Sequence, residues 1–244
     1  MSKNLEAINR DFKKNFYVIF KKPELIQGYL NSRSKEFDLI IRQGFKKFGL
    51  GNDFAIVALG GYGRNELFPG SDIDLSIIQL TKSTNKLEDV SHFIAWLWTL
   101  NVKIAHSVRT IRDIERITKS DLKEFTSYLS NRIIFCPDEK KIKLTQALTL
   151  ISKGWGKSKF FKAKKLEQFA RFASFDSTEF SLEPDLKESP GCLRDFHTAL
   201  WILEHCFEVS SLIDCSRLDL FNKKDLVNIN KSYCHIKSLR FLLN

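Results

Sequence analysis

The chain has 244 residues, of which 43% are hydrophobic and 28% are charged, a composition that is typical of a folded globular protein and excludes an intrinsically disordered one. The formal net charge of +10 favours anionic partners such as nucleotides. The basic residues are spread along the chain without a basic tail, which argues against a dedicated nucleic-acid surface. The five cysteines form no C-x-x-C pair and no apolar run approaches membrane-spanning length, so we expect a cytoplasmic protein without a membrane segment.

In chain order, large apolar residues at helical spacing predict helical structure over residues 4–48. An apolar run over 54–59 predicts a first strand, and a second apolar run that ends near Leu80 predicts another. Residues 86–101 are predicted to form a helix, and the alternation over 102–111 predicts a third strand.

Helices are predicted to dominate the remainder of the chain, over residues 119–135, 139–151, 158–174, 193–209 and 223–243. Ser181–Asp195 interrupts them with two prolines and a glycine, which predicts a structured, charged loop. The order of elements predicts an α/β (α+β) protein with a helical segment over 1–50, an α/β core over 51–117 and a helical domain over 118–244.

The most informative stretch is residues 59–75, in which a glycine-rich turn separates the first two predicted strands. The turn contains Gly60, Gly61 and Gly63, whose missing side chains allow backbone N–H groups to approach phosphate oxygens. Asp72 and Asp74 follow two residues apart in a strand-like run, so both carboxylates are expected on one face. Paired carboxylates suit Mg²⁺, and the combination predicts nucleotidyl transfer. The competing interpretation of the aspartate pair is an ordinary turn at a strand edge.

Further candidates are charged or polar residues near this motif and in the later loop. The predicted third strand has no acidic residue, so a third carboxylate would come from Glu183, Asp185, Glu188 or Asp195. The candidate nucleotide ligands besides the glycines are Arg64, Ser71, Arg109, Lys187 and Arg194. Three competing structural interpretations stay open: an ion pair between Arg64 and Glu66, a salt-bridged loop between helices, and simple packing of His106.

The stretch Gly-Gly-Tyr-Gly-Arg-x-Glu-Leu, followed by Ser-Asp-Ile-Asp-Leu, resembles the DNA polymerase β-type nucleotidyltransferases. Within that superfamily it is most similar to the N-terminal part of the bacterial PII uridylyltransferase/uridylyl-removing enzymes. Ala105–Thr110 and Leu182–Asp195 resemble two further segments of that family. The departures are asparagine, serine and cysteine where the family usually has glycine, and aspartate where it has asparagine: Asn65, Ser189, Cys192 and Asp185.

The resemblance implies a polymerase β-type domain with a small mixed sheet, followed by an all-helical domain. It further implies transfer of UMP from UTP to a tyrosine hydroxyl of a PII-type signalling protein in nitrogen regulation. Pyrophosphate would be released, and Asp72 and Asp74 would hold two Mg²⁺ ions. The family's HD hydrolase and ACT domains have no counterpart in these residues, which contain no His-Asp dipeptide.

Two alternatives stay open. One keeps the chemistry but changes the base or the acceptor, as in protein adenylylation or modification of an RNA end. The other is a nucleotide-binding regulator whose catalysis has lapsed.

Overall fold

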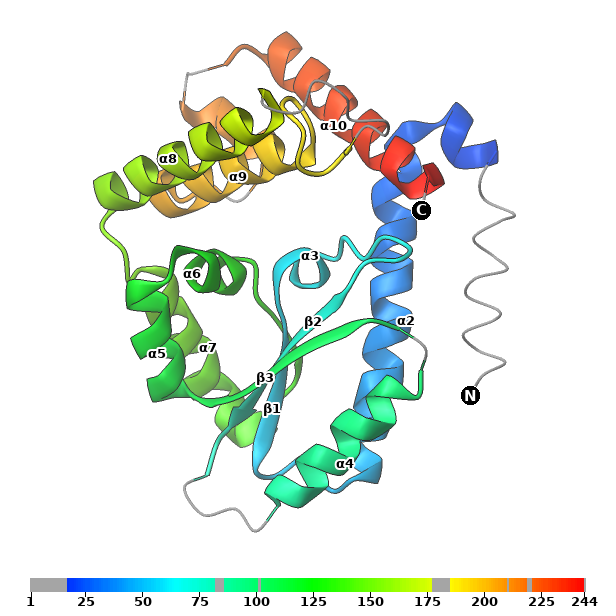
Figure 1. The fold of residues 1–244 in the computed structure, drawn as a ribbon, viewed down its shortest axis with the longest axis vertical. Coiled ribbons are helices and arrows are strands. Elements are labelled where there is room, and N and C mark those ends of the chain that lie inside the picture. The colour runs from blue at the N-terminus through cyan, green and yellow to red at the C-terminus, as the bar shows by residue number, and fades with distance from the viewer. Residues whose placement is uncertain are drawn as a thin grey trace. The chain divides into compact units, whose positions relative to one another are not determined.

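The computed structural model describes residues 17–81, 86–100, 102–176, 185–209, 211–218 and 221–243 (Figure 1). Contacts divide the chain into two compact units. The sheet unit contains Gly28–Gly154, and the helical unit contains Trp155–Asn244 together with the segment that ends at Gln27. None of the helices in the described ranges has the length and apolar character needed to cross a membrane.

The sheet unit is built on four strands in the order β3-β2-β1-β4. The strands are β1 (Phe54–Ala58), β2 (Ile73–Gln79), β3 (Ile104–Thr110) and β4 (Arg132–Phe135). β1 pairs antiparallel with both β2 and β4, whereas β2 and β3 are parallel. This mixed sheet, flanked by helices, confirms the α+β class.

Both faces of the sheet are covered by helices, as Figure 1 shows. One face packs on α2 (Ile26–Lys47) and α4 (Leu87–Trp98), and the other on α5 (Ile111–Ser120), α6 (Leu122–Leu129) and α7 (Asp138–Ser152). Each face of the sheet has its own apolar core. Alternate strand residues belong to one core or the other, because successive side chains of a strand point to opposite faces. Ile56 and Ile77 lie in the core under α2 and α4, whereas Val57 and Ile78 lie in the core under α5 to α7.

The helical unit contains α8 (Lys157–Asp176), α9 (Leu193–Phe207) and α10 (Lys223–Leu243), with short 3-10 turns η1 (Pro23–Leu25) and η2 (Ile213–Leu218). Its own apolar cluster includes Leu203, Val209, Cys215 and Leu226. The amine of Lys237 donates to Gln27 Oε1 at 2.6 Å, which ties α10 to the first turn of α2 within this unit.

Most predicted elements are confirmed to within a few residues, but the helix predicted over 119–135 is right only for α6, and α5 is not predicted beyond its last two residues. α5 ends at Ser120, α6 begins under the cap of Asp121, and residues 132–135 form β4. Pairing of β4 with β1 is a long-range contact that local spacing does not reveal. Because β4 and α7 pack with the sheet, the contacts divide the chain near residue 154 rather than at 117. Residues 4–16 and 181–184 of the predicted helix and loop lie outside the described residues.

Candidate functional site

Asp72 and Asp74 lie at the start of β2. Asp72 precedes the strand and is exposed, and Asp74 is its second residue and is half-buried. Ile73 between them is only 2% exposed and belongs to the core under α2 and α4. Because side chains alternate along a strand, the Asp74 carboxylate points away from that core, and the same alternation, continued to the residue before the strand, predicts that side for Asp72. The backbone here is held on both sides, by Leu59 N–H to the Asp74 carbonyl at 3.0 Å and by Ile73 N–H to the Lys103 carbonyl at 2.8 Å.

The glycine turn forms a short helical turn, α3 (Gly60–Gly63), directly after β1. Gly60 has a φ of +56°, in the left-handed region that favours glycine. A methyl group placed on Gly60 would lie 3.1 Å from Asp74 Oδ2, so this carboxylate sits against the bare backbone of the turn. The structure therefore brings together Gly60 and Asp74, two residues that the motif predicts to share a site.

The other two glycines of the turn have different surroundings. A methyl group on Gly63 would lie 1.7 Å from the carbonyl oxygen of Ser130, so Gly63 is required for close packing of the turn on the chain before β4. A methyl group on Gly61 would meet nothing closer than the Glu66 carbonyl oxygen at 3.5 Å, an ordinary contact. Packing within the fold therefore accounts for Gly63 and leaves Gly61 available for approach by a ligand.

Arg64 and Ser71 flank the turn. Arg64 Nε donates to Glu66 Oε2 at 3.0 Å and Nη1 donates to Ser130 Oγ at 3.2 Å. This is the ion pair that the competing interpretation expected, and it holds the end of the turn in place. Ser71 is half-buried, and its backbone N–H donates to the Phe68 carbonyl at 3.2 Å. Nucleotide binding by either side chain stays a prediction.

Arg109 forms a two-pronged ion pair with Glu124 of α6, with N···O distances of 2.6 and 2.8 Å. Hydrogen bonding to this carboxylate raises the pKa of Arg109. The residue paired with Asp74 on β3 is Ala105. Because a strand rises about 3.3 Å per residue, the Arg109 backbone lies roughly 13 Å farther along β3. Its structural partner is therefore Glu124, and the nucleotide-binding role that the sequence predicted for Arg109 is untested.

His106 is paired with Leu75, so it lies on the opposite face of the sheet from Asp74. Its ring is exposed, and the ring centroid lies 5.9 Å from that of Trp98. This arrangement agrees with the packing interpretation of His106.

The later loop belongs to the helical unit, whereas Asp72 and Asp74 belong to the sheet unit. In its described part, Asp185 Oδ1 accepts the backbone N–H groups of Lys187 and Glu188 at 2.8 and 3.0 Å. The carboxylate of Glu188 accepts Nε and Nη2 of Arg194, at distances down to 2.6 Å. Burial opposes the charge on Glu188, but Arg194, Lys187 and Arg171 together outweigh it, and the pKa of this carboxyl is lowered.

The carboxylate of Asp195, at the start of α9, is also held by hydrogen bonds and an ion pair. It accepts Arg171 Nη2, Gln168 Nε2 at 2.9 Å and the Gly191 backbone N–H at 2.6 Å. The amine of Lys187 lies 3.8 Å from Glu188. This part of the loop is thus a salt-bridged connection between α8 and α9, as the competing interpretation expected. Glu183 lies outside the described residues, and the third carboxylate and the anion-binding roles of Lys187 and Arg194 stay predictions.

The donors at the start of β2 fit a Mg²⁺–triphosphate complex. Within the described ranges, no group of three or more His, Cys, Asp or Glu side chains is placed to hold a metal ion. Mg²⁺ usually takes one or two protein carboxylates and completes its shell with phosphate oxygens and water. Two aspartates beside an open glycine turn match that requirement, whereas an all-protein metal cage does not fit these residues.

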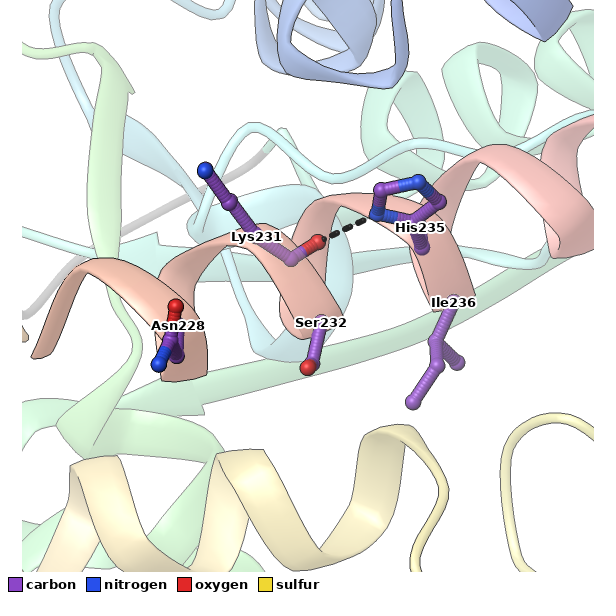
Figure 2. Close-up of a pocket in the computed structure, with 5 residues that line it drawn as sticks. All are labelled: Asn228, Lys231, Ser232, His235 and Ile236. Carbon is purple, nitrogen blue, oxygen red and sulfur yellow. Dashed lines mark hydrogen bonds between the residues drawn. The ribbon is translucent and has the colours of Figure 1, made fainter. Parts of the chain in front are cut away.

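A separate hollow lies along α10, lined by Asn228, Lys231, Ser232, His235 and Ile236 (Figure 2). Its lining residues share one face of a single helix, and His235 Nδ1 lies 2.8 Å from the Lys231 carbonyl. No carboxylate lines it, so it is not a second candidate for the metal.

The turn is supported from the interior by Tyr62, Asp38 and Arg132. The motif did not identify these three residues as part of the site. Tyr62 of α3 is buried, and it contacts Asp38 of α2 and Arg132 of β4. A charged residue in the apolar stripe of a predicted helix, as Asp38 is, is a signal that could have found them.

Comparison with known proteins places these features in a family. The model of the family described as GlnD PII-uridylyltransferase matches residues 159–244. The chain is 34% identical over 88% of its length to the "Bifunctional uridylyltransferase/uridylyl-removing enzyme" of Vibrio campbellii. Proteins of the same name from Vibrio cholerae and Hydrogenovibrio crunogenus are 31% and 32% identical over 100% and 99% of the chain. The chain covers 25%, 28% and 27%, respectively, of these curated relatives.

Proposed function

The chain belongs to the GlnD PII-uridylyltransferase family, and we propose that it carries the nucleotidyltransferase activity of such an enzyme. In this reaction UMP passes from UTP to a tyrosine hydroxyl of a PII-type signalling protein in the cytoplasm. The single observation that carries the proposal is the position of the Asp74 carboxylate against the bare backbone of Gly60, where a methyl group would lie 3.1 Å from Asp74 Oδ2.

Asp72 and Asp74 would hold Mg²⁺, and two ions are proposed. The chemistry supplied by bound Mg²⁺ is neutralisation of charge on the donor phosphates and activation of the attacking oxygen. The bare backbone of Gly60 and Gly61 would lie against the phosphates, where N–H groups stabilise charge without needing to reorganise. The tyrosine oxygen, whose proton is released to water, then bonds to the α-phosphorus, the bond from that phosphorus to the oxygen bridging the α- and β-phosphates breaks, and pyrophosphate leaves.

The departures from the family motif are compatible with an active site. Asn65 has a φ of +57°, the conformation for which glycine is favoured. Asparagine is among the residues that tolerate this conformation best, so the turn keeps its shape. Cys192 has a φ of −95°, which any residue adopts. These two replacements therefore give no support to a lapsed enzyme.

The test is incorporation of label from α-³²P-UTP, and in parallel from α-³²P-ATP, into a purified PII-type protein with Mg²⁺. The Asp72→Asn/Asp74→Asn double variant is expected to lose at least about 100-fold in rate, the scale of losing electrostatic stabilisation of a transition state. Glu88→Gln, which removes one exposed carboxylate from α4, is the matched control and should transfer normally.

Each outcome has a distinct meaning. Transfer by the double variant at the wild-type rate would contradict the assignment of the carboxylates. Transfer from ATP alone would keep the chemistry and change the base. Nucleotide binding without transfer from either donor would favour a regulator or another acceptor.

A further inference from the structure

Tyr62 is the one residue of α3 with a side chain, and that side chain is anchored in the interior. It is 1% exposed and belongs to the core under α2 and α4. Its hydroxyl donates to Asp38 Oδ1 of α2 at 2.6 Å. Burial and the charge of Asp38 both raise the pKa of this phenol, so it stays protonated and keeps donating.

Arg132 of β4 completes the network from the other side. Its guanidinium donates to both carboxylate oxygens of Asp38. Nη2 also donates to the backbone carbonyl of Tyr62 at 3.2 Å. Arg132 therefore holds the side-chain partner of Tyr62 and the backbone of α3 at the same time. Asp38 itself is only 7% exposed, so the carboxylate depends on these two donors.

The network of Asp38, Tyr62 and Arg132 does more than fill space in the core. A phenylalanine at position 62 would occupy the same space without placing a carboxylate in the interior. A buried polar network instead fixes orientation, because its hydrogen bonds form only in one arrangement. The orientation in question is that of the turn whose first residue, Gly60, lies against Asp74.

We propose that Asp38, Tyr62 and Arg132 are positioning residues that hold the Gly60–Gly63 turn against Asp74 in the geometry that receives a nucleoside triphosphate. The inference rests on the proposed function. The three residues need not touch the substrate, since they act through the backbone of the turn.

The experiment combines an exchange measurement, which needs no activity, with a binding measurement. Two backbone amides report the turn directly: Gly63 N–H donates to Leu59 and Arg64 N–H donates to Gly60. In Tyr62→Phe these two amides are expected to exchange hydrogen about tenfold faster than in the wild type, a change of about 1.4 kcal/mol. The dissociation constant for Mg²⁺–UTP, measured by calorimetry, is expected to rise about tenfold.

Arg42 supplies the matched control. Its Nε donates to the Ile134 carbonyl at 2.8 Å, so it also ties α2 to β4, through a hydrogen bond that does not involve α3. Arg42→Met is expected to lower the thermal midpoint of the sheet unit. It should leave the exchange of the turn amides and the affinity for Mg²⁺–UTP within about twofold of the wild type. Asp38→Asn, which keeps an acceptor for Tyr62 but loses the charge, should behave like Tyr62→Phe.

Unchanged exchange of the Gly63 and Arg64 amides in Tyr62→Phe would overturn the positioning role, whatever the affinity. Faster exchange with unaltered affinity, in a chain whose wild type binds UTP, would overturn the link to the ligand while leaving the proposed function intact. A wild-type chain that binds neither UTP nor ATP would contradict the proposed function itself, and with it the ligand part of this inference.

Discussion

Gly60, Gly61 and Gly63 look equivalent in the motif, but each meets a different neighbour. Gly60 lies next to the Asp74 carboxylate, and Gly63 packs closely against the Ser130 carbonyl. Gly61 has room for a side chain. Only the first and second positions are suited to face a ligand. The third is a packing requirement between the turn and the chain that enters β4.

Gly63→Ala is therefore expected to destabilise the sheet unit more than Gly61→Ala. The added methyl group would overlap a backbone carbonyl at 1.7 Å, which side-chain motion cannot relieve. Overpacking of this kind lowers the free energy of unfolding by about 3 kcal/mol. Urea denaturation followed by circular dichroism measures it. Equal stabilities of the two variants would show that the chain before β4 can move away from the added methyl group at little cost in free energy.

Lys164 of α8 is a buried cation, only 2% exposed, that lies over the Trp201 ring and pairs with Glu167. Burial lowers its pKa below the usual 10.5, and Glu167 restores only part of the difference. The folded state thus releases this proton more readily than the unfolded state. Stability contributed through this group rises with pH as the lysine loses its charge.

Lys164→Met is accordingly expected to raise the free energy of unfolding by about 1 kcal/mol at pH 7, since an apolar side chain of similar volume avoids the desolvation of the charge. The gain should shrink as the pH rises toward the usual lysine pKa of 10.5, because the lowered pKa of Lys164 makes the folded wild type lose this charge first. Thermal melts at several pH values measure it, with the exposed Lys165→Met as control. A less stable Lys164→Met protein would mean that the contacts with Trp201 and Glu167 outweigh the burial of charge.

At the scale of elements, polar residues at helix starts decide where β3, α5 and α6 begin and end. Thr110 ends β3 and caps α5 in a reciprocal arrangement with Asp113. Asp121 caps α6 by accepting the N–H groups of Lys123 and Glu124 at 2.7 and 3.0 Å. The second cap begins α6 inside the range 119–135 that apolar spacing predicts as one helix, and it places Glu124 where it reaches Arg109.

The Arg109–Glu124 pair is expected to join β3 to α6 rather than to bind the nucleotide. Arg109→Met and Glu124→Gln should each lower the free energy of unfolding, with a coupling of roughly 1 kcal/mol in the double-mutant cycle, because the partners are 22% and 27% exposed. The affinity of Arg109→Met for Mg²⁺–UTP should match that of the wild type. A selective loss of affinity in this variant would instead restore Arg109 as a phosphate ligand.

At the scale of the whole molecule, each compact unit has an apolar core of its own. The four tryptophans are divided evenly between the units, with Trp96 and Trp98 in the sheet unit and Trp155 and Trp201 in the helical unit. Fluorescence can therefore report on either unit once the other pair is replaced by phenylalanine.

We expect Gly63→Ala to lower the urea midpoint reported by Trp96 and Trp98 while leaving the midpoint reported by Trp155 and Trp201 unchanged. The physical reason is that each unit has an apolar core of its own, and separate cores can unfold in separate transitions. Equilibrium denaturation of the two reporter proteins, with and without Gly63→Ala, makes the comparison. A parallel shift of both midpoints would show one cooperative unit.

The sequence by itself determined the helices with strong apolar periodicity, the first three strands, the glycine turn and the pair of aspartates. Each of these depends on residues close together along the chain, where periodicity and turn chemistry act locally. Asp72 and Asp74 could be predicted to share one side because alternation along a strand is a local rule.

Only the tertiary structure decided what the remaining residues contact. The strand β4, the pairing of Arg109 with Glu124 and the ties of Asp38 and Arg132 to Tyr62 join elements that are far apart in sequence. Residues 38 and 132 are separated by 94 positions, and nothing local to either one specifies the other. Such contacts form because the two faces of the sheet must be covered, and that requirement acts on the folded chain as a whole.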